Sequence, residues 1–136
     1  MFKNLRNISG SARLSGWGVT ENRIQSTSDV LLSAQVGIRD YEACKSEFEG
    51  IGHVTGNMIF AGGYEDACKG DSGGPLTCWK GQERYLCGIV SWGTDCAHKD
   101  NKYYPSVYTD VRKYGRWVAA QLESWGEVKG KFMNKC

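Results

Sequence analysis

The run Gly70-Asp71-Ser72-Gly73-Gly74-Pro75 is the most informative stretch of this 136-residue sequence. At average residue usage, chance would produce this hexapeptide on the order of once in a hundred thousand chains of this size. Glycines on both sides of Ser72 let the backbone turn with no side chains in front of its amide groups. The run therefore indicates a serine held in a tight turn of defined geometry.

Further motifs flank this run in a definite order. Cys68 precedes Ser72 by four residues, and Ser15-Gly16-Trp17-Gly18 lies upstream. The downstream motifs are the runs CGIVSWG at 87–93 and PSVYTDV at 105–111, with Cys96 between them. From about Ala12 to Trp125, the sequence resembles the C-terminal half of a trypsin-like protease of the chymotrypsin family. The resemblance implies the second six-stranded antiparallel β-barrel of that family's double barrel.

Hydrophobic patterning predicts an all-β chain with an α-helix at its C-terminal end. Apolar or alternating runs predict strands at 30–38, 58–61, 76–78, 85–92 and 107–111, with a hairpin turn at 80–83. Apolar residues then follow at helical spacing: Val111, Tyr114, Trp117, Val118, Leu122 and Trp125. Asp110 or Thr109 can cap this helix, and Gly126 can end it. We expect a residual linker at 1–11, the protease half at 12–126 and a basic tail at 127–136.

The resemblance implies catalytic roles around Ser72. Ser72 would be the nucleophile, and the N–H groups of Gly70 and Ser72 would form the oxyanion hole. Asp71 corresponds to the aspartate that pairs with the new amino terminus at zymogen activation. A serine hydroxyl is a poor nucleophile without a base, and the oxyanion that forms needs donors already aimed at it.

The resemblance also implies a pocket for a basic side chain. Asp66, six residues before Ser72, matches the acid at the base of the primary pocket in trypsin-like members. Ser91, Trp92 and Gly93 would form one wall, and Tyr108 would lie behind the pocket. Because a carboxylate at the bottom of an apolar slot pairs with Arg or Lys, we expect protein or peptide substrates cleaved after those residues.

Two residues depart from the family pattern at this pocket. Ser106 stands where a wall glycine is usual, and Asp95 replaces a frequent glycine at the rim. Three consequences of Ser106 are open: a preference for Lys over Arg, a water bridge, or a pocket closed to long side chains. Pro105 resembles the proline of members without an allosteric sodium site, so we expect no metal and no cofactor.

Six cysteines in so short a chain favour an oxidising compartment. The competing interpretation, a zinc site, is discounted because no pair has the C-x2-C or H-x3-H spacing that such a site needs. By resemblance, Cys68 and Cys96 form the disulfide that joins the nucleophile loop to the pocket wall. The positions that would pair with Cys78 and Cys44 in the family hold Ala12 and Phe60.

These replacements leave several pairings open. A Cys78–Cys87 bridge across the hairpin is possible if the register brings the two opposite each other. Cys44 and Cys136 would then pair together, pair with a missing N-terminal part, or stay free.

A working triad needs a histidine and an aspartate that the first barrel supplies. The histidines of this chain are His53 and His98, each in a segment typical of a solvated loop. We therefore expect the second half of a complete secreted protease, inactive alone, whose partner is the missing N-terminal barrel. The alternative is a truncated, non-catalytic homologue that acts as a secreted binding module.

Charge and hydropathy exclude several partners. With 17 basic and 15 acidic residues, the net charge of +2 gives no reason to expect nucleic acid or an anionic membrane. No segment approaches the roughly 18 apolar residues of a membrane span, and Met1 to Ser11 lacks the apolar core of a signal peptide. We expect an extracellular protein whose N-terminal part precedes the sequence given. Protein protease inhibitors are further expected partners.

Overall fold

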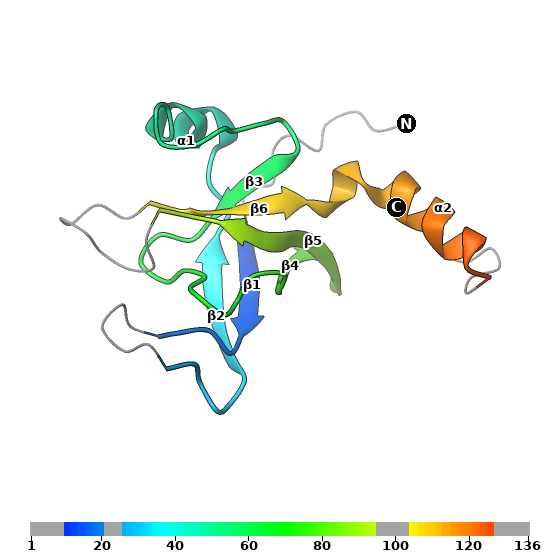
Figure 1. The fold of residues 1–136 in the computed structure, drawn as a ribbon, viewed down its shortest axis with the longest axis horizontal. Helices are drawn as coiled ribbons and strands as arrows, with labels where there is room; N and C mark the ends of the chain where they lie inside the picture. The colour runs from blue at the N-terminus through cyan, green and yellow to red at the C-terminus, as the bar shows by residue number, and fades with distance from the viewer. Residues whose placement is uncertain (1–9, 21–25, 95–103, 127–136) are drawn as a thin grey trace.

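The computed structural model describes residues 10–20, 26–94 and 104–126. Within these residues, strands dominate the element order (Figure 1). The strands are β1 (Ser11–Gly16), β2 (Leu32–Gly37), β3 (Met58–Ala61), β4 (Pro75–Lys80), β5 (Glu83–Trp92) and β6 (Ser106–Asp110). The helical segments are α1 (Tyr41–Glu47), the 3₁₀ turn η1 (Val111–Lys113) and α2 (Gly115–Ser124).

The strands form one six-stranded antiparallel sheet in the order β2-β1-β4-β5-β6-β3. Its two edge strands meet at one corner. Ile38, just after β2, bridges to Ala61, and the Gly62 N–H donates to the Gly37 carbonyl at 3.0 Å. The contact curls the sheet towards closure, which confirms the predicted six-stranded barrel.

Alternation along the strands places apolar side chains inside the curled sheet. Ala12 and Leu14 of β1 are buried, as are Leu76 and Cys78 of β4, while their sequence neighbours face outwards or lie half-buried. A second apolar cluster lies on the other side of β3 and β6. It contains Cys44, Phe48, Phe60 and Val107.

Two elements have no counterpart among the predicted ones. β1 is short and carries small and polar residues, so its alternation is weak. α1 is a seven-residue helix. Its N-cap is Asp40, whose carboxylate accepts from the Ala43 N–H at 2.9 Å, and Cys44 and Phe48, one helical turn apart, turn inwards. The hydrophobic patterning, which predicts strands and one C-terminal helix, therefore misses one strand and one helix.

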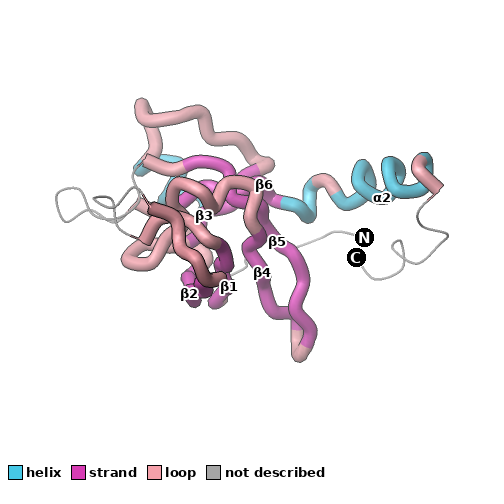
Figure 2. The backbone as a smooth tube through the Cα atoms, turned by 60° about the horizontal axis from the view of Figure 1, so that its bottom comes forward, coloured by secondary structure: helices cyan, strands magenta, loops and turns pink. Residues whose placement is uncertain are grey.

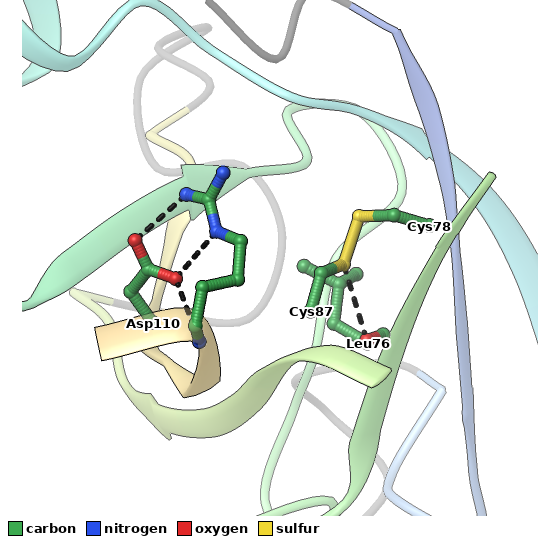
Figure 3. Close-up of polar contacts among 5 residues, drawn as sticks. Leu76, Cys78, Cys87 and Asp110 are labelled. Atoms are coloured by element: carbon green, nitrogen blue, oxygen red, sulfur yellow. Dashed lines mark hydrogen bonds and ion pairs between the residues drawn. A yellow bond between two sulfur atoms is a disulfide. The ribbon is translucent and has the colours of Figure 1, made fainter. Parts of the chain in front are cut away.

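The C-terminal helix is confirmed, but it begins with a separate turn. Asp110 caps η1 by accepting from the Arg112 N–H at 3.2 Å, and its carboxylate also binds the Arg112 guanidinium at 2.6 and 2.7 Å (Figure 3). Gly115 therefore opens α2 and does not interrupt it, and Gly126 follows its end at φ 73°. α2 buries no residue and projects away from the sheet (Figures 1 and 2).

A disulfide joins Cys78 of β4 to Cys87 of β5, with their Cα atoms 5.7 Å apart (Figure 3). The register does not place them opposite each other, because Cys78 pairs with Tyr85. A bulge makes the bond possible: Thr77 pairs with Leu86 and Leu76 with Gly88, which leaves Cys87 as the extra residue. Both cysteines are consequently buried, and the bridge that the sequence left open is present.

Candidate active site

Ser72 lies on an exposed turn between β3 and β4. The Asp71 N–H donates to the Cys68 carbonyl at 3.0 Å, and the Gly74 N–H donates back to the Asp71 carbonyl at 2.8 Å. Gly70 and Gly73 have φ values of 98° and 80°, a backbone region that favours glycine. The glycines of the hexapeptide are thus required by the shape of the turn.

β5 fixes the far side of this turn. The Gly73 N–H donates to the Val90 carbonyl, and the Val90 N–H donates to the Gly74 carbonyl, both at 3.0 Å. Among the described residues, the N–H groups of Gly70 and Ser72 have no hydrogen-bond acceptor in the protein. These two amides, predicted to form the oxyanion hole, are available to a ligand.

The carboxylate of Asp71 points away from solvent, under the end of β1. It accepts from the Gly18 N–H at 2.8 Å and from the Cys68 N–H at 3.0 Å. Gly16 and Gly18 approach it so closely that a Cβ at either position would collide with the carboxylate. This packing explains why the motif at 15–18 has two glycines, a link that sequence reasoning did not make. Pairing of Asp71 with an amino terminus stays a prediction.

Asp66 is half-buried below the same turn. Its carboxylate accepts from the Ala67 N–H at 2.8 Å and lies against Gly62, where an added Cβ would come within 2.7 Å of Oδ1. Burial raises the pKa of Asp66 from 3.8 to about 6, and the hydrogen bond from the Ala67 N–H opposes the rise. A strongly perturbed carboxyl group in such a position is typical of a functional site.

β6 supplies the residues around Asp66. Ser106 is buried, and its hydroxyl oxygen lies 3.3 Å from where a Cβ on Gly93 would be. Tyr108 is fully buried, and its hydroxyl has no partner among the described residues. Burial raises the pKa of Tyr108 above its usual range, and the nearby carboxylates of Asp66 and Asp71 raise it further. The structure thus brings Asp66, Ser106 and Tyr108 together, with Gly93 beside them.

Trp92 is held by an aromatic cluster that the sequence did not predict. Its ring meets Phe48 edge-on, at a centroid distance of 5.4 Å, and Phe48 also contacts Phe60 and Tyr104. Gly52 packs against the same indole, where an added Cβ would come within 2.5 Å of the ring. The sequence signal for this packing was the four-residue spacing of Cys44 and Phe48, which places both side chains on one face of a helix. Ser91, one residue earlier, is exposed.

The structure describes some of the cysteines and histidines that the sequence singled out. Cys68 is disulfide-bonded; its predicted partner Cys96 lies outside the described residues, as do Asp95, His98 and Cys136. Cys44 is a buried free thiol beside Phe60, which is one of the three alternatives that the sequence left open. His53 is exposed on a loop.

The described part of the chain holds no group of three or more His, Cys, Asp or Glu side chains placed to bind a metal ion. Of the helices in that part, none has the length and apolar character needed to cross a membrane.

Several known proteins are similar to this chain in sequence and in fold. The family model described as Trypsin matches residues 4–118. Pig (Sus scrofa) trypsin is 43% identical over 108 residues, which are 77% of this chain and 43% of that protein. Mouse (Mus musculus) hepatocyte growth factor activator serine protease is 39% identical over 110 residues, which are 78% of this chain and 16% of that protein.

A solved structure supports the same relationship. Neuropsin, a serine protease expressed in the limbic system of mouse brain, superposes with a TM-score of 0.71 at 33% identity, over 85% of this chain and 49% of that one. The chain belongs to the trypsin family of serine proteases. It spans less than half the length of the relatives it matches.

Proposed function

We propose that this chain is the nucleophile-bearing half of a secreted serine endopeptidase with trypsin-like specificity. The observation that carries the proposal is the half-buried carboxylate of Asp66, which lies six residues before Ser72 and beside Ser106 and Tyr108. A buried acid favours a cationic partner, because the pairing restores the solvation that burial removed. The bound substrate would be a protein or peptide with Lys or Arg before the scissile bond.

Ser72 would attack the carbonyl carbon of that bond. The N–H groups of Gly70 and Ser72 would stabilise the oxyanion, and the amine product would leave behind an acyl-enzyme that water hydrolyses. Asp71 would hold the turn by its bonds to Gly18 and Cys68. Each of these groups belongs to this chain.

Proton transfer is the step for which the described residues of this chain offer no group. Ser72 needs a base, and His53, the histidine among the described residues, is solvated on a loop. We therefore propose that the other barrel supplies the histidine and the aspartate. Protein protease inhibitors would bind the assembled site, and the disulfide between Cys78 and Cys87 suits an extracellular setting.

The test is hydrolysis of Lys and Arg peptide amides by the 136-residue chain. Without a base, the oxyanion hole and binding leave at most a residual rate of roughly 10³–10⁴-fold over the uncatalysed reaction, far below that of a working protease, so we expect no hydrolysis that differs measurably between the natural chain and Ser72→Ala. Hydrolysis well above that level that disappears in Ser72→Ala would show that the chain holds its own base. If the complete protein with the other barrel also failed to cleave, the binding-module alternative would replace the protease proposal.

A further inference from the structure

The disulfide between β4 and β5 includes the extra residue of the bulge, Cys87 (Figure 3). In a regular antiparallel pair, Cys87 would lie diagonal to Cys78, because Cys78 pairs with Tyr85, two residues before Cys87. Cα atoms at diagonal positions are about 7–8 Å apart, whereas those of a disulfide usually lie within about 6.8 Å. Here the Cα atoms of the two cysteines are 5.7 Å apart. The bond therefore requires a departure from the regular ladder, and the bulge supplies it.

The bond and the bulge consequently stabilise each other. A bond that fits the bulged ladder and not the regular one lowers the free energy of the bulged form alone. Ala12, the direct neighbour of Cys78 in β1, offers no thiol to which Cys78 could bond instead. Cys78 is 2% exposed and Cys87 is 0% exposed, so the bond is enclosed in the core and acts on the bulge from within.

The bulge sets which residue of β5 faces the Ser72 turn. Beyond it, the Val90 N–H donates to the Gly74 carbonyl, and the Val90 carbonyl accepts from the Gly73 N–H, both at 3.0 Å. Without the extra residue, this part of β5 would shift by one position against β4, and each of its side chains would turn to the other face of the sheet. Val90, which is 8% exposed, would then leave the core. The bulge thus selects Val90 as the anchor of the turn.

We propose that the disulfide between Cys78 and Cys87 positions the Ser72 turn, because it holds the bulge that keeps β5 in the anchoring register. This inference rests on the proposed function, in which Ser72 is the nucleophile and the amides beside it bind the oxyanion. Such groups act only when they are held to within roughly 0.5 Å of the productive geometry. Cys78 and Cys87 are therefore positioning residues that act through β5.

The test is amide hydrogen exchange, followed by NMR on the ¹⁵N-labelled 136-residue chain without reductant. Cys78→Ala/Cys87→Ala removes the bond. Cys78→Val/Cys87→Val also removes it but refills the core with side chains that favour strands, so it guards against loss of folding in the alanine variant.

Two pairs of amides separate a local effect from a general loss of stability. The reporters are Gly73 and Val90, which join the turn to β5. The references are Arg39 and Gly62, whose N–H groups donate at 2.9 and 3.0 Å where the two edge strands meet. We expect both double variants to speed exchange at the reporters by about tenfold or more beyond any change at the references, because a local opening frees only the amides that it exposes.

Val36→Ala is the matched control. Val36 is 3% exposed in β2, on the far side of β1 from β4, so its truncation lowers stability without touching the bulge. It should speed exchange at reporters and references alike.

Equal acceleration at reporters and references in both disulfide variants would overturn the inference, because the bond would then stabilise the whole fold without positioning the turn. This measurement involves no hydrolysis, so that result would leave the proposed function in place. Failure of the complete protein to cleave Lys and Arg peptide amides would remove the proposed function and leave the exchange result unaffected.

Discussion

Asp66, which we propose as a substrate-binding residue, is costly for the fold. The Ala67 N–H supplies a hydrogen bond, yet burial dominates and raises the pKa of Asp66 to about 6. The native state therefore holds a proton on Asp66 at pH values where the unfolded chain has released it. That contribution to stability is present below pH 3.8 and is lost as the pH rises through about 6.

Asp66→Asn should stabilise the protein at neutral pH. The amide keeps the shape of the side chain and removes the cost of a buried charge, so we expect a gain of about 2–3 kcal/mol at pH 8 and almost none at pH 4. Urea unfolding at the two pH values measures this difference. An equal effect at both would mean that Asp66 is not destabilised by its burial.

Cys44 is a second residue whose surroundings decide its chemistry. It is 1% exposed, and burial, with Glu47 as the next cause, raises its pKa to about 11. Because the thiolate is the reactive form, we expect no alkylation of Cys44 by iodoacetamide in the native chain at pH 8. Peptide mapping after labelling checks this, with the urea-unfolded chain as the positive control. Labelling of native Cys44 within minutes would contradict its place in the core.

At the scale of elements, the β4–β5 hairpin carries its own disulfide. Ala12 is the direct neighbour of Cys78 in β1, and it leaves Cys78 free to bond within the hairpin. The closed loop is short, with a sequence separation of nine residues. The bond therefore ties two neighbouring strands and not distant parts of the barrel.

The double variant Cys78→Ala/Cys87→Ala should lose about 2–3 kcal/mol of stability, the entropy that a loop of this size removes from the unfolded chain. Urea unfolding without reductant measures the loss. Mass spectrometry of a non-reduced digest should find Cys78 linked to Cys87. A peptide that links Cys78 to any other cysteine would contradict the structure.

The sequence predicts the elements with strong patterns and misses those with weak ones. Met58–Ala61 was predicted at its observed bounds because an apolar run is unambiguous. α1 was missed because its inward side is narrow, with Cys44 and Phe48 as its buried residues. In the candidate site, local motifs singled out Asp66 and Ser72, whose roles stay predictions. The packing of Gly16 and Gly18 on Asp71, and of Phe48 on Trp92, depends on contacts between distant segments that no local pattern records.

At the scale of the whole molecule, the exposed apolar side chains of the described residues include two groups that lie near one another in the sequence. Val30 and Leu31, before β2, are 65% and 55% exposed. On α2, Trp117 is 63% exposed, and Trp125, at its C-cap, is 71% exposed. Exposed apolar groups that gather in this way are typical of surfaces that pack against another domain or partner.

The chain alone should therefore self-associate in a concentration-dependent manner. We expect Val30→Ser/Leu31→Ser to reduce the association seen by sedimentation velocity, because it removes two adjacent exposed side chains. Ile51→Ser, which removes an apolar side chain that is 48% exposed elsewhere, is the matched control. A monodisperse monomer at high concentration would contradict this expectation.

We propose that the Asp66 carboxylate, beside the Ser72 turn, is the base of a binding site for a cation. The most direct measurement is a titration of the ¹⁵N-labelled chain with benzylamine, followed by amide chemical shifts at pH 8. We predict shifts at Asp66, Ala67, Gly93 and Ser106 that are absent in Asp66→Asn and fade as the pH falls below about 6. Shifts that gather around Val30 and Leu31, or that persist in Asp66→Asn, would show that the cation binds elsewhere and that Asp66 is not the base of a substrate pocket.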